Sequence, residues 1–181
     1  MRVMLSIVAA LLIASATPAQ AASNAQPNLL SFGLGYMNFN KSESHKQSAD
    51  FRAEYRWGVS LLPKMSTWFS GWDRYVQLHP FVAGEVTSLG ALYGLGGLAF
   101  DGYIGRHIIV TWSEGVGLFY RGNMAPLGSF VEFRSQIELG WRFKNEMRVT
   151  AQVSHISNAG LTRRNPGAEI AGVYFHVPIG R

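Results

Sequence analysis

The sequence contains no cysteine, which excludes disulfide bonds, cysteine-ligated zinc sites and thiol chemistry. Charged residues are scarce, at 15% of the chain, whereas about 25% is usual for a soluble domain. Beyond the first 22 residues there is no apolar run of the roughly 18 residues that a membrane-spanning helix needs. Glycine, aromatic and aliphatic residues are nevertheless abundant. The composition therefore indicates a protein that faces lipid without crossing it as a helix.

The first 22 residues have the features of a secretory signal peptide. Arg2 supplies a positive charge, residues 3–16 are apolar, and Ala19-Gln20-Ala21 is a small-x-small cleavage site. We expect this segment to be removed, which leaves residues 23–181 as a single domain. Loss of Arg2 lowers the formal net charge from +5 to +4, a balance too small to indicate a nucleic-acid partner.

Polar and apolar residues alternate along most of the remaining chain. In residues 51–61 the odd positions hold Phe, Ala, Tyr, Trp, Val and Leu, while Arg52, Glu54 and Arg56 lie between them. Residues 129–143 repeat this period of two, which is typical of strands. The apolar face carries aromatics towards the strand ends, and the polar face carries opposite charges in succession. Both features favour a transmembrane β-barrel with a narrow, charge-paired lumen.

We predict an all-β fold, an eight-stranded antiparallel transmembrane β-barrel of the bacterial outer membrane. The predicted strands are residues 28–39, 49–61, 75–87, 91–104, 106–120, 129–143, 146–157 and 168–178. Eight strands leave little room for a pore, so we interpret the charged residues of the polar face as pairs that fill the lumen. These residues are Arg52, Glu54, Arg56, Glu85, Glu132, Arg134, Glu138 and Arg142.

The lengths of the connections give the barrel an orientation. The turn at Lys144-Asn145-Glu146 is short, whereas segments 40–48, 121–128 and 158–167 are long. Outer-membrane barrels place short turns in the periplasm and long loops outside. Segment 62–74 is long for a periplasmic turn, and we expect its three large aromatic residues to dock at the membrane interface.

Three residues near the end of the chain carry the chemistry. His155 and Ser157 lie two residues apart on a predicted strand, so they project from one face. That face is otherwise apolar, which points both side chains towards lipid. Glu169 has the same phase on the next strand, and both it and His155 lie seven residues from Thr162. The pairing predicts that a carboxylate, an imidazole and a hydroxyl lie next to one another in space. These are the three groups of a serine nucleophile and the residues that activate it.

Two interpretations of this outward-facing group remain open. A charged side chain at lipid depth is costly, by several kcal/mol, which favours a function. Alternatively, all three residues lie at headgroup level, where polar side chains are tolerated. No other histidine has a serine two residues later, because the corresponding positions after His45, His79, His107 and His176 hold Gln, Phe, Ile and Pro.

The run from His155 to Gly160, followed by Asn165-Pro166-Gly167 and Glu169, resembles the signature of the lipid A 3-O-deacylase family (PagL type). Members of this family are eight-stranded outer-membrane barrels that hydrolyse the acyl ester at the 3-position of lipid A, the membrane anchor of lipopolysaccharide. The resemblance implies a hydrolase in the outer membrane whose partners are lipopolysaccharide and membrane lipid. It also implies a site that faces the outer leaflet and needs neither metal nor another cofactor.

The resemblance also implies a role for each residue of the signature. Ser157 is expected as the nucleophile, His155 as the general base, and Glu169 as the residue that orients His155. Asn158 is expected in the oxyanion hole or in shaping it, and Asn165 is expected to share that duty. A backbone N–H near Asn158 or Gly160 is a candidate second donor.

Weaker signals leave further alternatives open. Arg163 and Arg164 lie in the loop directly beside the site and suit the phosphates of lipid A, although a solvated outer loop explains them equally well. A lipid A acyltransferase would use a similar site to transfer an acyl chain rather than release it. A non-catalytic structural barrel would carry the His-x-Ser sequence by chance.

Overall fold

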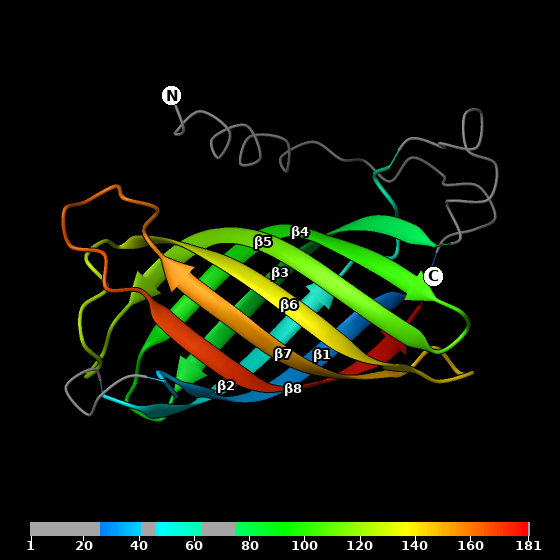
Figure 1. Ribbon diagram of the computed structural model, residues 1–181, viewed down its shortest axis with the longest axis horizontal. Coiled ribbons are helices and arrows are strands. Elements are labelled where there is room, and N and C mark those ends of the chain that lie inside the picture. The colour runs from blue at the N-terminus through cyan, green and yellow to red at the C-terminus, as the bar shows by residue number, and fades with distance from the viewer. Residues whose placement is uncertain (1–25, 41–45, 63–74, 181) are drawn as a thin grey trace.

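The computed structural model describes residues 26–40, 46–62 and 75–180. Within these residues, eight antiparallel strands form a closed barrel in which each strand pairs with the next and β1 pairs with β8 (Figure 1). The strands are β1 (Asn28–Met37), β2 (Ser48–Arg56), β3 (Val76–Thr87), β4 (Leu92–Ile104), β5 (Ile108–Tyr120), β6 (Val131–Arg142), β7 (Arg148–Ser157) and β8 (Ala168–Ile179). The predicted fold class is confirmed. The predicted strand ends lie within two residues of those observed, except that β2 ends at Arg56, five residues before the predicted end.

Two sequence predictions fall on parts of the chain that are not described. The expected signal peptide, residues 1–22, and nearly all of segment 62–74 lie outside the described residues. In the described ranges, no helix is long and apolar enough to cross a membrane.

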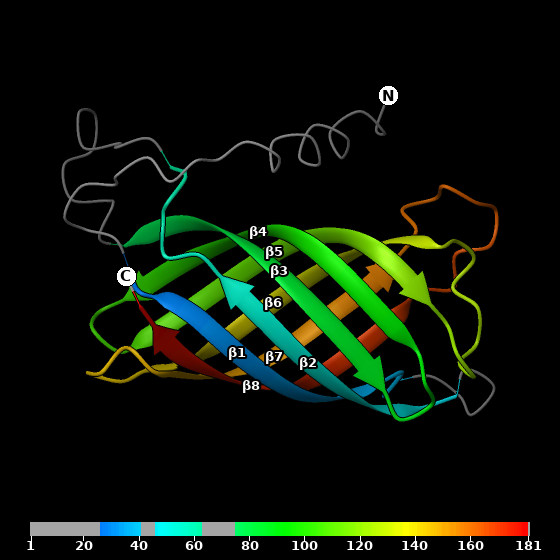
Figure 2. The same ribbon diagram turned by 180° about the vertical axis from the view of Figure 1, so that it is seen from behind.

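The connections separate into two ends, as the two opposite views show (Figures 1 and 2). The β4–β5 turn and the β6–β7 turn close one end, and Phe143 and Met147 bracket the latter with a backbone hydrogen bond of 2.8 Å. The long β5–β6 and β7–β8 connections meet at the other end. The short turn predicted at residues 144–146 is confirmed, and the long loops gather at the end expected to face outward.

The outer wall of the barrel is apolar. Alternate residues of each strand project outward, and large apolar side chains there are about half exposed. Examples from five strands are Phe32, Phe51, Trp112, Ile137 and Val153. Because a closed barrel leaves no strand edge unpaired, such a wall satisfies every backbone group while facing hydrocarbon.

The lumen is filled by paired charges rather than by water-filled space. Arg52 contacts Asp50 at 2.5 Å, and Arg134 contacts both Glu85 and Glu54. Arg56 bridges to Glu54 at 2.7 Å, beside further pairs across the barrel. The expected charge pairing is therefore confirmed for most of the predicted set, and the pairs tie together strands far apart in sequence.

Two members of that set behave differently. Glu132 makes no ion pair within the described residues and instead accepts the backbone N–H of Ser129 at 3.3 Å. Arg142 lies at the short-turn end, where it pairs with Glu146 at 3.4 Å and is partly exposed. Both residues lie near a strand end, where a charged side chain reaches a turn or loop instead of the packed lumen.

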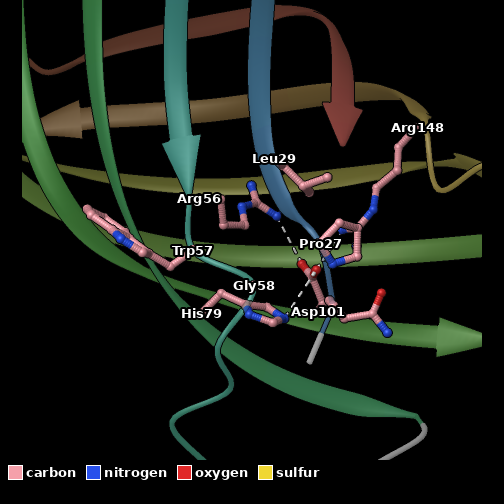
Figure 3. Close-up of a pocket in the computed structure, with 9 residues that line it drawn as sticks. Pro27, Leu29, Arg56, Trp57, Gly58, His79, Asp101 and Arg148 are labelled. Atoms are coloured by element: carbon pink, nitrogen blue, oxygen red, sulfur yellow. Dashed lines mark hydrogen bonds and ion pairs between the residues drawn. The ribbon is translucent and has the colours of Figure 1, made fainter. Parts of the chain in front are cut away.

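Asp101 is the centre of the charge cluster at the short-turn end of the lumen (Figure 3). Its carboxylate contacts Arg56 at 3.0 Å and Arg148 at 2.7 Å, and it accepts a hydrogen bond from Thr111 at 2.7 Å. Asp101 has no solvent exposure. A buried charge that satisfies two cations in this way fixes the mutual positions of β2, β4 and β7.

Replacing Asp101 with alanine should lower the free energy of unfolding by about 3–5 kcal/mol, because two buried guanidinium groups lose their shared anion. Urea unfolding of the barrel in lipid vesicles, followed by tryptophan fluorescence, measures the change. Glu146→Gln is the matched control, since it breaks a partly exposed pair worth about 1 kcal/mol or less. Equal, small losses in both variants would contradict a structural role for the lumen pairs.

Candidate active site

The register of the last hairpin brings His155 and Glu169 together. β7 and β8 pair so that the two residues lie directly opposite each other, and His155 Nδ1 lies 3.2 Å from Glu169 Oε1. Both side chains face outward, since the His155 side chain is 51% exposed and that of Glu169 is 23% exposed. The proximity expected from the equal spacing about Thr162 is therefore present. A carboxylate that accepts a hydrogen bond from Nδ1–H keeps the proton on that nitrogen and leaves Nε2 free to act as a base.

Ser157 ends β7 on the same face as His155. It lies opposite Phe133 of β6 and is half-buried, immediately before the long β7–β8 loop. Within the described residues, no hydrogen bond joins the Ser157 hydroxyl to the His155 ring. Catalytic hydrogen bonds are often long without substrate and tighten when substrate binds. The arrangement thus places a hydroxyl two residues from an oriented imidazole, on the same face of β7.

Gly167 forms the surface on which the His155 ring rests. Its φ angle is +63°, and a Cβ added there would lie 2.6 Å from His155 Cε1 and 3.3 Å from Nε2. Any side chain at this position would therefore push the ring away. Sequence reasoning missed this role, although a glycine directly after proline in the signature was a signal that the backbone there needs a special conformation.

Asn158 holds the loop beside the site. The two hydrogens of its fully buried Nδ2 are shared among three acceptors: the carbonyl oxygen of Leu127 at 3.3 Å, the hydroxyl oxygen of Thr162 at 3.0 Å and the carbonyl oxygen of Arg164 at 2.8 Å. Its Oδ1 accepts the N–H of Gly160 at 3.0 Å. Because both ends of the amide are engaged, Asn158 shapes the loop and has no free donor for a substrate.

Gly128 explains how the two long loops approach each other closely. Its φ angle is +108°, and a Cβ there would collide with the carbonyl oxygen of Arg164 and lie 2.9 Å from Asn158 Nδ2. No pattern in the sequence indicates this contact, because the two segments are separated by an entire hairpin.

Asn165 has the free amide donor that Asn158 lacks. Its Oδ1 accepts the backbone N–H of Asn158 at 3.1 Å, which fixes the orientation of the amide. The side chain is exposed, and Nδ2 has no hydrogen-bond partner in the described part of the chain. The backbone N–H groups of Gly160 and Asn158 are occupied by Asn158 Oδ1 and Asn165 Oδ1, so Asn165 Nδ2 is the expected donor without a partner among the described residues.

Arg163 and Arg164 are both exposed in the same loop. Neither guanidinium group forms an ion pair with another described residue, whereas the backbone carbonyl of Arg164 is held by Asn158 and Thr162. The backbone is thus fixed while the two positive side chains remain available to an anion.

Asn158→Asp should loosen the β7–β8 loop without affecting the barrel, because a carboxylate cannot donate to the two carbonyl oxygens that the amide now binds. Trypsin cleaves after Arg163 and Arg164, so the rate of cleavage in this loop measures the change directly. We expect cleavage at least tenfold faster than in the wild type. Leu161→Ala, an exposed change in the same loop, is the control, and equal rates for the two variants would contradict the role of Asn158.

Comparison with known proteins gives concordant matches. The family model described as lipid A 3-O-deacylase (PagL) matches residues 33–178. The lipid A deacylase PagL of Pseudomonas aeruginosa is 38% identical over 53 residues, which are 29% of this chain and 31% of that protein. The alignment therefore spans about a third of the relative's length.

Solved structures agree on the architecture. The crystal structure of the outer membrane enzyme PagL has a TM-score of 0.62 at 20% identity, covering 83% of this chain and 99% of its own. A de novo designed transmembrane β-barrel has a TM-score of 0.54 at 9% identity, covering 86% of this chain and 98% of its own. At these identities the two structures bear on the fold alone.

Proposed function

The chain belongs to the lipid A 3-O-deacylase (PagL) family, and from this premise we propose that it hydrolyses the 3-O-linked acyl ester of lipid A in the outer membrane. The observation that carries the proposal is the His155–Glu169 pair on the outward face of the hairpin, beside Ser157. A carboxylate–imidazole pair next to a hydroxyl is the arrangement of a serine esterase. Its position on an apolar wall suits a substrate that is itself a membrane lipid.

The proposed reaction proceeds through an acyl-enzyme. Glu169 accepts a hydrogen bond from the Nδ1–H of His155 and holds the ring so that Nε2 takes the proton of the Ser157 hydroxyl. The serine oxygen attacks the ester carbonyl, and the C–O bond to the sugar then breaks as Nε2 returns the proton to the departing sugar oxygen. Water, deprotonated in turn by His155, attacks the acyl-serine and releases the fatty acid, which regenerates Ser157.

We assign the side chain of Asn165 as an oxyanion donor. The tetrahedral intermediate places a negative charge on the former carbonyl oxygen, next to Ser157. Asn165 is anchored to the N–H of Asn158, the residue after Ser157, and presents an Nδ2 with no partner among the described residues. A donor held in place before the reaction stabilises the developing charge without reorganisation. Asn158 then acts indirectly, by fixing the loop that carries Asn165.

Substrate is expected to approach along the outer wall. The acyl chains of lipid A lie parallel to the barrel in the outer leaflet, so the substrate reaches Ser157 by lateral diffusion. The phosphates of lipid A lie at headgroup level, where Arg163 and Arg164 present exposed guanidinium groups. Arginine binds phosphate through two parallel hydrogen bonds, which would hold the sugar above the site.

Ser157→Ala and His155→Ala should abolish loss of a 3-hydroxyacyl group from lipid A, because each removes a group that takes part in bond making. Glu169→Ala should retain more activity, since it removes only the residue that orients the base. Mass spectrometry of lipid A from membranes containing each folded barrel measures all three. Equal loss for Glu169→Ala and Ser157→Ala would contradict a purely orienting role for the carboxylate.

The masses of lipid A measured in this experiment also distinguish the alternative functions. A gain in mass with the wild-type barrel would indicate an acyltransferase. No change in mass, with the barrel shown to be folded, would contradict both enzymatic functions and leave a structural barrel.

Gly167→Ala should lower kcat/KM by about 100-fold, because its Cβ displaces the His155 ring and a 1 Å misplacement of a catalytic group has an effect of that order. Gly160→Ala is the matched control: Gly160 lies in the same β7–β8 loop and also has a positive φ angle, +81°, but open space where a Cβ would lie. Backbone strain in this loop would slow both variants alike, an outcome that would exclude packing against the ring as the reason for glycine at position 167.

A further inference from the structure

The outer wall carries a second carboxylate outside the proposed catalytic group. Glu114 is exposed at the middle of β5, on the same outward face as Trp112 and Leu118. An acidic side chain on the lipid-facing wall of a barrel is destabilising. A function that uses Glu114 would offset this loss of stability.

Glu114 is held in a fixed position by two donors. Its Oε1 accepts the indole N–H of Trp112 at 3.0 Å, and its Oε2 accepts the hydroxyl of Ser135 at 2.8 Å. An ionised carboxylate has about four acceptor positions, so two positions remain open. Glu114, paired with Ser135, can therefore accept a further hydrogen bond from a donor outside the protein.

The register places this pair beside the catalytic histidine. Glu114 lies opposite Ser135, Ser135 lies opposite His155, and His155 lies opposite Glu169. One continuous polar row therefore crosses four strands of an otherwise apolar wall. On the far side the row ends at Leu98, the β4 partner of Glu114.

The row also descends away from the outer end of the barrel. Glu169 and His155 lie within two residues of the outer ends of β8 and β7, whereas Ser135 lies further along β6 and Glu114 at the middle of β5. Below the row, Ile137 and Val153 continue the apolar wall. Ser135 and Glu114 therefore lie on the side of the site towards which acyl chains run, and away from the sugar.

The distance between Ser135 and Ser157 suits a polar group of the substrate that lies close to the ester. Ser135 lies one strand and two residues from Ser157, which corresponds to about 8 Å between their Cα atoms at standard strand dimensions. An ester carbonyl in contact with Ser157 covers part of this span, and a hydroxyl two carbons further along the acyl chain covers most of the rest. A plain hydrocarbon chain at the same place would leave Ser135 and Glu114 without a new partner.

We propose that Ser135 and Glu114 form a subsite that binds the hydroxyl group of a hydroxylated acyl chain and so selects 3-hydroxyacyl esters. This inference rests on the proposed function, because it assumes that an acyl ester is cleaved at Ser157. The substrate hydroxyl donates its one hydrogen to an open acceptor position of the Glu114 carboxylate, beside the Ser135 hydroxyl that donates to the same carboxylate. Binding in this way also fixes the direction in which the chain leaves the site.

The test compares two lipid A substrates that differ only in the hydroxyl of the 3-O-linked chain. For the wild type we expect kcat/KM to be about tenfold or more higher on the hydroxylated substrate, the effect of one hydrogen bond to a charged group. Glu114→Gln and Ser135→Ala should each reduce this preference by slowing cleavage of the hydroxylated substrate only. Glu146→Gln, a matched change in the short β6–β7 turn, should preserve it.

The possible results separate the subsite from the catalytic proposal. Equal wild-type rates on both substrates, or variants that slow both substrates by the same factor, would overturn the subsite while leaving the esterase intact. A folded wild-type barrel that cleaves neither substrate would overturn the proposed function and the subsite together. Because Glu114→Gln removes a charge from the lipid face, it should fold at least as well as the wild type, so a selective loss is not a folding defect.

Discussion

Closure of the barrel is the constraint on which the rest of the structure depends. Once β1 pairs with β8, every strand has two neighbours, and each residue faces either a narrow lumen or the surroundings. The lumen accepts charges only as pairs, as the contacts of Asp101 with Arg56 and Arg148 show. The outer wall accepts few polar side chains at all. Polar residues that nevertheless face outward are therefore the informative ones.

The packed lumen has a consequence for the site on the opposite face. Ion pairs across the barrel, such as Arg134 with Glu54 and Glu85, oppose any slip of one strand along another. A slip of a single residue would move every side chain to the other face. The register that aligns His155 with Glu169 is thus fixed partly by residues that never meet a substrate. A rigid support of this kind is what the proposed catalytic pair requires, because the His155 side chain is 51% exposed and is not held by burial.

Period-two alternation was enough to predict the strands, the lumen charges and the outward direction of His155 and Ser157. The pairing of His155 with Glu169 also followed, because a hairpin centred on Thr162 makes the two positions equivalent. The role of Asn158 did not follow, since its partner Leu127 belongs to a different loop whose path depends on the folded barrel. Sequence reasoning missed Glu114, although it interrupts the apolar face of its strand. Its relation to His155 depends on the β5–β6 register, and a long connection leaves that register undetermined in sequence.

The polar row on the outer wall links stability to specificity. Glu114, Ser135, His155 and Glu169 each replace an apolar side chain that lipid would favour. Binding a lipid through its sugar alone would not require them to extend towards the middle of the barrel wall. A row that begins at Glu169 and His155, beside Ser157, and continues towards the middle of the wall instead matches a substrate whose polarity extends beyond the ester. In the proposed subsite, the barrel gives up some stability in the membrane for contacts with a hydroxylated chain, a balance common at functional sites.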